Sequence, residues 1–109
     1  MKVIHIESGL GNQMLSFCEY LALKKMNPKD DFYLETIIYD IPQCNETICQ
    51  WNGYELERIF NVQVPNIRKI VDPADWKILI ESITASQFWK RNWNYPVYFT
   101  KAFAKIGID

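Results

Sequence analysis

The chain has 109 residues, of which 49% are hydrophobic, and a formal net charge of -1 at pH 7. This composition excludes a disordered tail, and a chain of this length buries enough apolar surface for one core but not for two domains. Nucleic-acid binding is disfavoured as well, because phosphate neutralisation needs grouped lysine and arginine residues and the sequence has no basic cluster. We therefore expect residues 1–109 to form a single domain.

The chain begins with a pattern that predicts a strand, a glycine-spaced turn and a helix. Lys2–Glu7 alternates polar and apolar side chains around β-branched residues, as a strand does. From Gln13 to Met26, apolar residues recur at spacings of three and four, which predicts a helix. Its expected inward face carries Met14, Phe17, Cys18, Leu21 and Ala22. Lys24, Lys25, an αL Asn27 and Pro28 are expected to end it.

The turn within Ser8–Met14 is the strongest candidate for a ligand-binding loop. Glycine accepts positive φ and lets another group approach the backbone, and the free N–H groups of the next helical turn favour an anion. The third glycine of a G-x-G-x-x-G fingerprint and the Gly-Lys-Ser/Thr of a P-loop are both missing. Two alternatives stay open: a tight connection whose glycines relieve crowding, or a binding loop formed by Gly9, Gly11, Asn12 and Gln13.

Phe32–Tyr39 is rich in β-branched and aromatic residues and predicts a second strand. A strand, helix and strand in this order predict a β-α-β unit with parallel strands and a right-handed crossover, and hence an α/β sheet. Ligands in such sheets bind beyond the carboxyl ends of the strands, where the glycine turn is expected to lie.

Further elements are expected downstream. Asn52–Phe60 predicts a short helix with Leu56, Ile59 and Phe60 facing inward, while residues 62–64 suggest a third short strand and residues 67–71 another extended stretch. Asp72 as N-cap and Pro73 at the first helical position predict a helix to about Ser86. Its apolar face would carry Trp76, Leu79, Ile80 and Ile83. Residues 101–109 predict a helix that stops at Gly107.

The three cysteines, Cys18, Cys44 and Cys49, form no C-x-x-C pair, which favours reduced, buried or half-buried thiols over a disulfide framework. Cys44 and Cys49 lack partners for a metal site, so we expect no metal. Residues 45–47 match a glycosylation pattern that we interpret as a plain surface loop. Neither a secretory signal nor a transmembrane run is visible, which predicts a cytoplasmic protein, with contact at the inner face of the membrane left open.

Two blocks of the sequence resemble a known family. Gly9-Leu10-Gly11-Asn12-Gln13-Met14, followed by a helix, resembles the N-terminal signature of glycosyltransferase family 11, the α-1,2-fucosyltransferases. Asn52–Phe60 resembles that family's N-G-Y-E-L-E-R-I-F block at a fitting spacing, although Trp51 stands where the family often has histidine. The resemblance implies a Rossmann-like lobe of a two-lobed, GT-B type fold. It also implies transfer of L-fucose from GDP-fucose to the 2-hydroxyl of a terminal galactose, without a metal or other cofactor.

The resemblance covers only the first lobe of such an enzyme. Members of the family are more than twice as long, and their H-x-R-R-x-D motif, which holds the GDP moiety, has no counterpart here, since the only histidine is His5. We therefore expect an N-terminal piece, inactive by itself, that offers the backbone N–H groups near Gly11 and Asn12, the Asn12 side chain and, as a second choice, Gln13. No catalytic residue is assigned. His5 and Glu7 are open to two interpretations: contact with the acceptor or a role as base, or a packed histidine and a capping or solvated glutamate.

Other interpretations of the chain stay open. One rival is a self-contained α/β module that binds a nucleotide or another anion without catalysis, and another is an interaction domain without a ligand.

The aromatic-rich segment Phe88–Phe99 fits an acceptor-sugar platform, ordinary packing, or a surface that a second lobe would cover. If it is exposed, it favours dimers.

Overall fold

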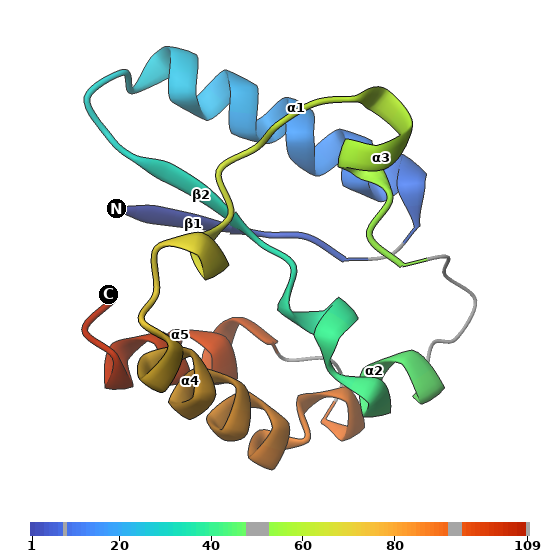
Figure 1. The fold of residues 1–109 in the computed structure, drawn as a ribbon, viewed down its shortest axis with the longest axis vertical. Helices are drawn as coiled ribbons and strands as arrows, with labels where there is room; N and C mark the ends of the chain where they lie inside the picture. Colours follow the sequence, from blue (N-terminus) through green and yellow to red (C-terminus); the bar gives the residue numbers. More distant parts are fainter. Residues whose placement is uncertain (8, 48–52, 92–94, 109) are drawn as a thin grey trace. The chain divides into compact units, whose positions relative to one another are not determined.

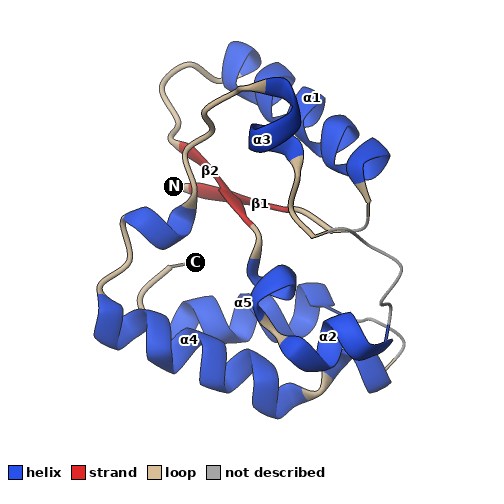
Figure 2. Ribbon diagram, turned by 45° about the vertical axis from the view of Figure 1, so that its right-hand side comes forward, coloured by secondary structure: helices blue, strands red, loops and turns tan. Residues whose placement is uncertain are grey.

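The computed structural model describes residues 1–7, 9–47, 53–91 and 95–108. The chain divides into two compact units, Met1–Ile70 and Val71–Asp109, called here the first and second units. Helices predominate, and among the described residues the strands form one two-stranded sheet, which lies in the first unit (Figure 2). The organisation of residues 1–109 as one domain stays a prediction.

The first unit is built on a parallel β-α-β arrangement. Strand β1 (Lys2–His5) pairs with strand β2 (Phe32–Glu35), so that Lys2 lies opposite Phe32 and His5 opposite Glu35. Helix α1 (Leu10–Met26) connects the two strands and packs against both of them (Figure 1). The predicted β-α-β unit is therefore confirmed, and the carboxyl ends of its strands meet at His5 and Glu35.

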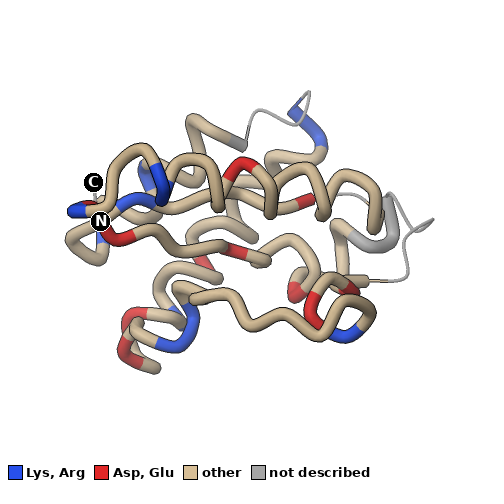
Figure 3. Tube along the Cα trace, turned by 90° about the horizontal axis from the view of Figure 1, so that it is seen from above, with Lys and Arg blue, Asp and Glu red and all other residues tan. Residues whose placement is uncertain are grey.

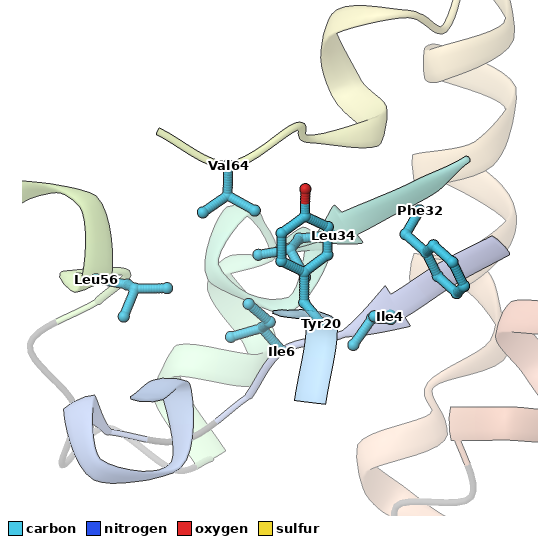
Figure 4. Close-up of a cluster of buried hydrophobic side chains, with 7 residues drawn as sticks. All are labelled: Ile4, Ile6, Tyr20, Phe32, Leu34, Leu56 and Val64. Atoms are coloured by element: carbon cyan, nitrogen blue, oxygen red, sulfur yellow. The ribbon is translucent and has the colours of Figure 1, made fainter. Parts of the chain in front are cut away.

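The core of the first unit gathers apolar side chains from the sheet, α1 and the segments that follow. On β1 and beyond it, alternate residues face the core, since side chains two apart share one face of a strand. Figure 4 shows the seven buried side chains converging: Ile4, Ile6, Tyr20, Phe32, Leu34, Leu56 and Val64. Each large apolar side chain buried in this way contributes about 1.5–3 kcal/mol, so this cluster holds α1 on the sheet.

Helix α1 begins earlier than the sequence predicts. Gly9 is its N-cap in an extended conformation (φ -83°, ψ -175°), so Gly11, Asn12 and Gln13 belong to the first helical turn and not to a loop. Gly9 does not adopt the positive φ that glycine permits, and among the described glycines positive φ occurs only at Gly53 and Gly107.

The face of α1 that packs inward also differs from the prediction. Gln13 and Tyr20 are buried and Phe17 is half-buried, with the Phe17 and Tyr20 rings stacked at 6.2 Å. Four residues of the predicted inward face are exposed instead: Met14, Cys18, Leu21 and Ala22. The spacing of three to four residues is present, but it begins at a polar residue, which the hydrophobic pattern does not register.

The segments that follow α1 depart from the prediction in detail. The helix does end at Met26, but Asn27 (φ -129°) is not αL; its backbone and side-chain N–H groups both donate to the Leu23 carbonyl. β2 ends at Glu35, and the expected continuation to Tyr39 is a 3-10 turn, η1 (Ile37–Asp40). The predicted loop at residues 45–47 is wrong, since these residues belong to helix α2 (Pro42–Thr47).

The region after the undescribed residues 48–52 contains helix α3 (Leu56–Phe60), which contacts α1. Leu56 is buried as predicted, but Ile59 and Phe60 are 48% and 45% exposed, so their predicted inward orientation is wrong. The Asn52 end of the predicted helix lies outside the described residues.

The third strand predicted before Pro65 is reduced to a single parallel bridge between Leu34 and Asn66. The Leu34 N–H donates to the Pro65 carbonyl at 2.8 Å. Proline has no N–H to continue a ladder, and the Asn66 side chain accepts a hydrogen bond from the Arg68 N–H. The chain therefore turns into the 3-10 segment η2 (Ile67–Lys69), and the prediction of an extended stretch there is wrong.

The second unit pairs helix α4 (Pro73–Ser86) with helix α5 (Tyr95–Lys105). Asp72 caps α4 as predicted, because its Oδ1 accepts a hydrogen bond of 2.9 Å from the Ala74 N–H. On the predicted apolar face of α4, Leu79 and Ile83 are buried, while Trp76 and Ile80 are half-buried. Gly107 (φ 83°) follows α5, as expected of a residue that stops a helix.

The cap of α4 gives a direct stability test. Asp72→Ala is expected to lower the free energy of unfolding by about 1 kcal/mol, because the Ala74 N–H loses its acceptor at the helix start. Chemical denaturation monitored by circular dichroism measures the change. Glu81→Ala, at an exposed position within α4, serves as control with an expected change below ~0.5 kcal/mol. Equal effects of the two substitutions would contradict a capping role for Asp72.

Three rings of the aromatic-rich segment pack inside the second unit. Phe88 and Trp89 belong to η3 (Phe88–Lys90), and Phe99 to α5; all three are buried. The Phe88 ring contacts Trp89 and Phe99 edge to face, with centroids 5.3 and 5.1 Å apart. These contacts support the packing interpretation for the three residues. Residues 92–94 lie outside the described part, so the sugar platform and the aromatic dimer surface stay predictions.

Basic and acidic residues are both distributed along the described parts of the chain (Figure 3). This distribution agrees with the near-neutral net charge of -1. Within the described ranges, none of the helices has the length and apolar character that a membrane span requires.

Candidate functional site

The predicted ligand loop lies where β1 passes into α1. Gly9 provides no side-chain cap, and the first turn of α1 contains no acidic residue. Gly11 and Asn12 are exposed at this helix end. Because the first N–H groups of a helix have no intrahelical acceptor, this terminus offers donors and a partial positive charge to an anion.

The two glycines leave open space at this helix end. A Cβ added at Gly9 or at Gly11 would meet nothing within 4 Å, and neither residue has a positive φ. Neither crowding nor an unusual backbone conformation within the described residues therefore requires glycine at these positions. The open space leaves the backbone of this helix end accessible, and the binding loop stays a prediction.

Gln13 lies just inside this turn, and its side chain points into the protein. Its Oε1 accepts hydrogen bonds from the N–H groups of Glu55 and Leu56, at 2.9 and 3.1 Å. Its Nε2 donates to the Gly53 carbonyl at 2.9 Å and to the Tyr39 hydroxyl at 3.2 Å. The side chain is fully buried, so we expect Gln13 to affect a ligand by positioning neighbouring segments.

The sequence did not single out Glu35, which forms the centre of the site together with His5. The Nδ1 atom of His5 lies 2.7 Å from Oε1 of Glu35, and its Nε2 lies 3.3 Å from Oε2 of Glu7. Glu35 is 1% exposed, and its Oε2 has no hydrogen-bond partner among the described residues. The available signal was the register of two parallel strands that each end in an ionisable residue.

In the triad of Glu35, His5 and Glu7, the opposite charges stabilise the ionised forms of His5 and Glu7. Burial alone would lower the pKa of His5, but the charge and hydrogen bond of Glu35, aided by Glu7, raise it to about 9. The hydrogen bond from His5 lowers the pKa of Glu7 below its ordinary value. His5 is therefore an imidazolium at neutral pH that donates from both ring nitrogens, which disfavours its role as a base.

Two tyrosines complete the surroundings of Gln13. The rings of Tyr39 and Tyr54 lie 5.9 Å apart, and Tyr39 contacts the Gln13 amide. Burial raises the pKa of Tyr54 to about 12 and also raises that of Tyr39. Both phenols therefore stay protonated at neutral pH and retain a hydrogen-bond donor.

The cysteines differ from one another in their surroundings. Cys44 is buried, and burial raises the pKa of its thiol to about 12. Cys18 is exposed, so the prediction of buried or half-buried thiols is confirmed for Cys44 and wrong for Cys18. Cys49 lies outside the described residues. No group of three potential metal ligands occurs in the described part, and the absence of a metal cofactor stays a prediction.

No protein-family model matches the chain, and comparisons with curated proteins and with solved structures also found no match. The resemblance to a family therefore depends on the two sequence blocks.

Proposed function

We propose that the chain is the N-terminal part of a galactoside α-1,2-fucosyltransferase-like enzyme, a glycosyltransferase with a Rossmann-like first lobe of the GT-B type. Its partners would be GDP-fucose and a glycan acceptor. The observation that carries the proposal is the contact of Gln13, in the first block, with Gly53, Glu55 and Leu56 of the second. Two blocks about 40 residues apart thus form one structural feature, which supports their interpretation as a joint signature.

The start of α1 suits the chemistry of fucosyl transfer. When the acceptor hydroxyl attacks the fucose, the leaving GDP gains negative charge, which fixed N–H donors stabilise. One such donor contributes about 3 kcal/mol in comparable enzyme sites. The N–H groups at Gly11 and Asn12 would supply part of this stabilisation. The second lobe implied by the resemblance would supply the remainder, so we expect no turnover from this chain alone.

Gly11→Ala tests whether the first turn of α1 approaches the phosphates. GDP titrated into the 15N-labelled chain is expected to shift the amide signals of Gly9, Gly11 and Asn12, with an affinity in roughly the millimolar range. Gly11→Ala should weaken this binding about fivefold or more, because the added methyl group occupies the space that the ligand needs. The fold should be unaffected, since the methyl group meets nothing within 4 Å.

The matched control is Leu15→Ala, at an exposed α1 position beyond the first turn. It should leave GDP binding unchanged. GDP binding by Gly11→Ala equal to that of the wild type, or GDP-induced shifts confined to other parts of the chain, would contradict the proposed site.

A self-contained anion-binding module is the second candidate, and the uncapped, acid-free start of α1 favours it. The two candidates differ in what they require of the parent reading frame. A fucosyltransferase requires a downstream H-x-R-R-x-D-like stretch to hold GDP, whereas a module requires none. Sequencing the full reading frame decides this point. A frame without that stretch would favour the module, and robust GDP-fucose turnover by the purified 109 residues would contradict the inactive-fragment account.

A further inference from the structure

Glu7 lies just before the glycine turn in the sequence and carries a partly exposed carboxylate. Glu7 follows His5 by two residues and precedes Gly9 by two. Its side chain is 40% exposed, and His5 Nε2 holds its Oε2 at 3.3 Å. Glu7 therefore presents a partly exposed carboxylate that His5 holds at one oxygen.

Glu35 provides a second, independent observation. One carboxylate oxygen of this buried residue contacts His5, while the other oxygen is buried without a partner among the described residues. Buried polar atoms are nearly always hydrogen-bonded, and an exception calls for a water or a ligand that supplies the missing donor. The His5 ring therefore lies between two carboxylates, and one of them has a buried oxygen without a partner among the described residues.

The charge of the triad indicates which kind of ligand suits it. Two carboxylates and one imidazolium carry a net negative charge, which repels phosphate groups. The N–H groups at the start of α1 attract phosphates instead. The Glu7 carboxylate therefore suits a neutral ligand that donates hydrogen bonds, such as a pyranose, more than it suits a phosphate.

We propose that the Glu7 carboxylate binds a hydroxyl group of the acceptor sugar, and that His5 and Glu35 are the positioning residues that hold this carboxylate in place. The inference depends on the proposed function, because that function supplies the neutral sugar acceptor. Glu35 fixes the His5 ring through Nδ1, and the opposite ring nitrogen then fixes Glu7. Glu35 thereby acts on the ligand through His5 and Glu7.

The test uses the 109-residue chain, labelled with 15N and titrated with methyl β-D-galactopyranoside. Binding is expected to shift the Glu7 amide and the ring signals of His5, the only histidine of the sequence. Glu7→Gln, which keeps the shape and removes the charge, should weaken sugar binding about fivefold or more. Glu19→Gln changes an exposed glutamate of α1 and should leave sugar binding unchanged. Absence of sugar-induced shifts at Glu7 and His5, or equal sugar binding by Glu7→Gln, would overturn the proposal.

The positioning roles are tested by the pH profile of sugar binding. In the wild type, affinity should fall as the pH rises through about 9, where His5 loses its proton. His5→Gln should bind sugar more weakly, and its affinity should not fall near pH 9. If His5 had a purely structural role, the variant would show the same pH dependence of sugar affinity as the wild type. Glu7, Glu35 and Tyr39 are the other titratable groups of the site, and burial raises the pKa of Tyr39. A wild-type profile that is flat through pH 9 would overturn the roles of His5 and Glu35.

The two proposals fail in different ways. Loss of the GDP-induced shifts at Gly11, with Glu7-dependent sugar binding retained, would reject the fucosyltransferase proposal and leave a sugar site. GDP binding at Gly11 without sugar binding at Glu7 would reject the sugar site alone.

Discussion

Gln13→Ala is expected to lower the free energy of unfolding of the first unit by about 3 kcal/mol or more. The substitution removes a fully buried amide and leaves the Glu55 and Leu56 N–H groups and the Gly53 carbonyl without their partner. Each buried backbone group left unsatisfied costs about 1–3 kcal/mol, and the cavity adds to this. Urea denaturation monitored by the amide signals of the first unit measures the loss.

Asn12→Ala is the matched control for Gln13→Ala, because Asn12 is the adjacent, exposed residue of the same turn. Its expected effect lies within about 0.5 kcal/mol. A third variant, Gln13→Glu, keeps an acceptor for the two N–H groups but places a charge in a buried site, so it should also be strongly destabilised. A Gln13→Ala variant as stable as Asn12→Ala would contradict the buried link between the two sequence blocks.

The second large effect is a loss of stability between neutral and mildly alkaline pH. The pKa of His5 is raised to about 9 in the folded protein from 6.5. The folded state therefore holds one proton more than the unfolded state between these values, and stability falls as the pH rises. The contribution is fully present below pH 6.5 and is lost as the pH rises through about 9, an expected decrease on the order of 3 kcal/mol. Urea denaturation at pH 6, 7, 8 and 8.5 measures the slope.

His5→Gln provides the control for this pH dependence. This variant should be less stable than the wild type at pH 6. Its free energy of unfolding should be nearly independent of pH up to 8.5, because the imidazole that binds the proton is absent. Burial raises the pKa of the Cys44 thiol and of Tyr54 to about 12, so alkaline losses from these groups begin at higher pH. A wild-type stability that rises or stays constant from pH 6 to 8.5 would show that Glu35 and Glu7 do not hold an imidazolium.

Local signals predicted those elements whose stabilising groups are close in sequence. The cap at Asp72 acts on an N–H group two residues away, and the order of β1, α1 and β2 follows from alternation and helical spacing. The predictions failed where contacts between residues distant in sequence determine which side chains are buried. The inward face of α1 begins at Gln13, because four hydrogen bonds offset the cost of burying its amide. No hydrophobic pattern contains that information.

The candidate site was predictable only in part. The glycine-spaced turn identified Gly9, Gly11 and Asn12, because glycine and a following helix form a recognisable local pattern. The pairing of His5 with Glu35 joins residues 30 positions apart and depends on strand register. Register is set by the core, since Ile4 and Leu34 lie opposite each other, and a shift by one residue would separate the triad.

The Gln13 side chain also couples hydrogen exchange at the Glu55 and Leu56 amides to opening of the first turn of α1. The amides of Glu55 and Leu56 are bonded to a side chain of α1 more than 40 residues earlier. They can exchange only when the first turn of α1 separates from them, so opening at either segment exposes both. A ligand that orders Gly11 and Asn12 should therefore slow hydrogen exchange at Glu55 and Leu56, which it does not touch.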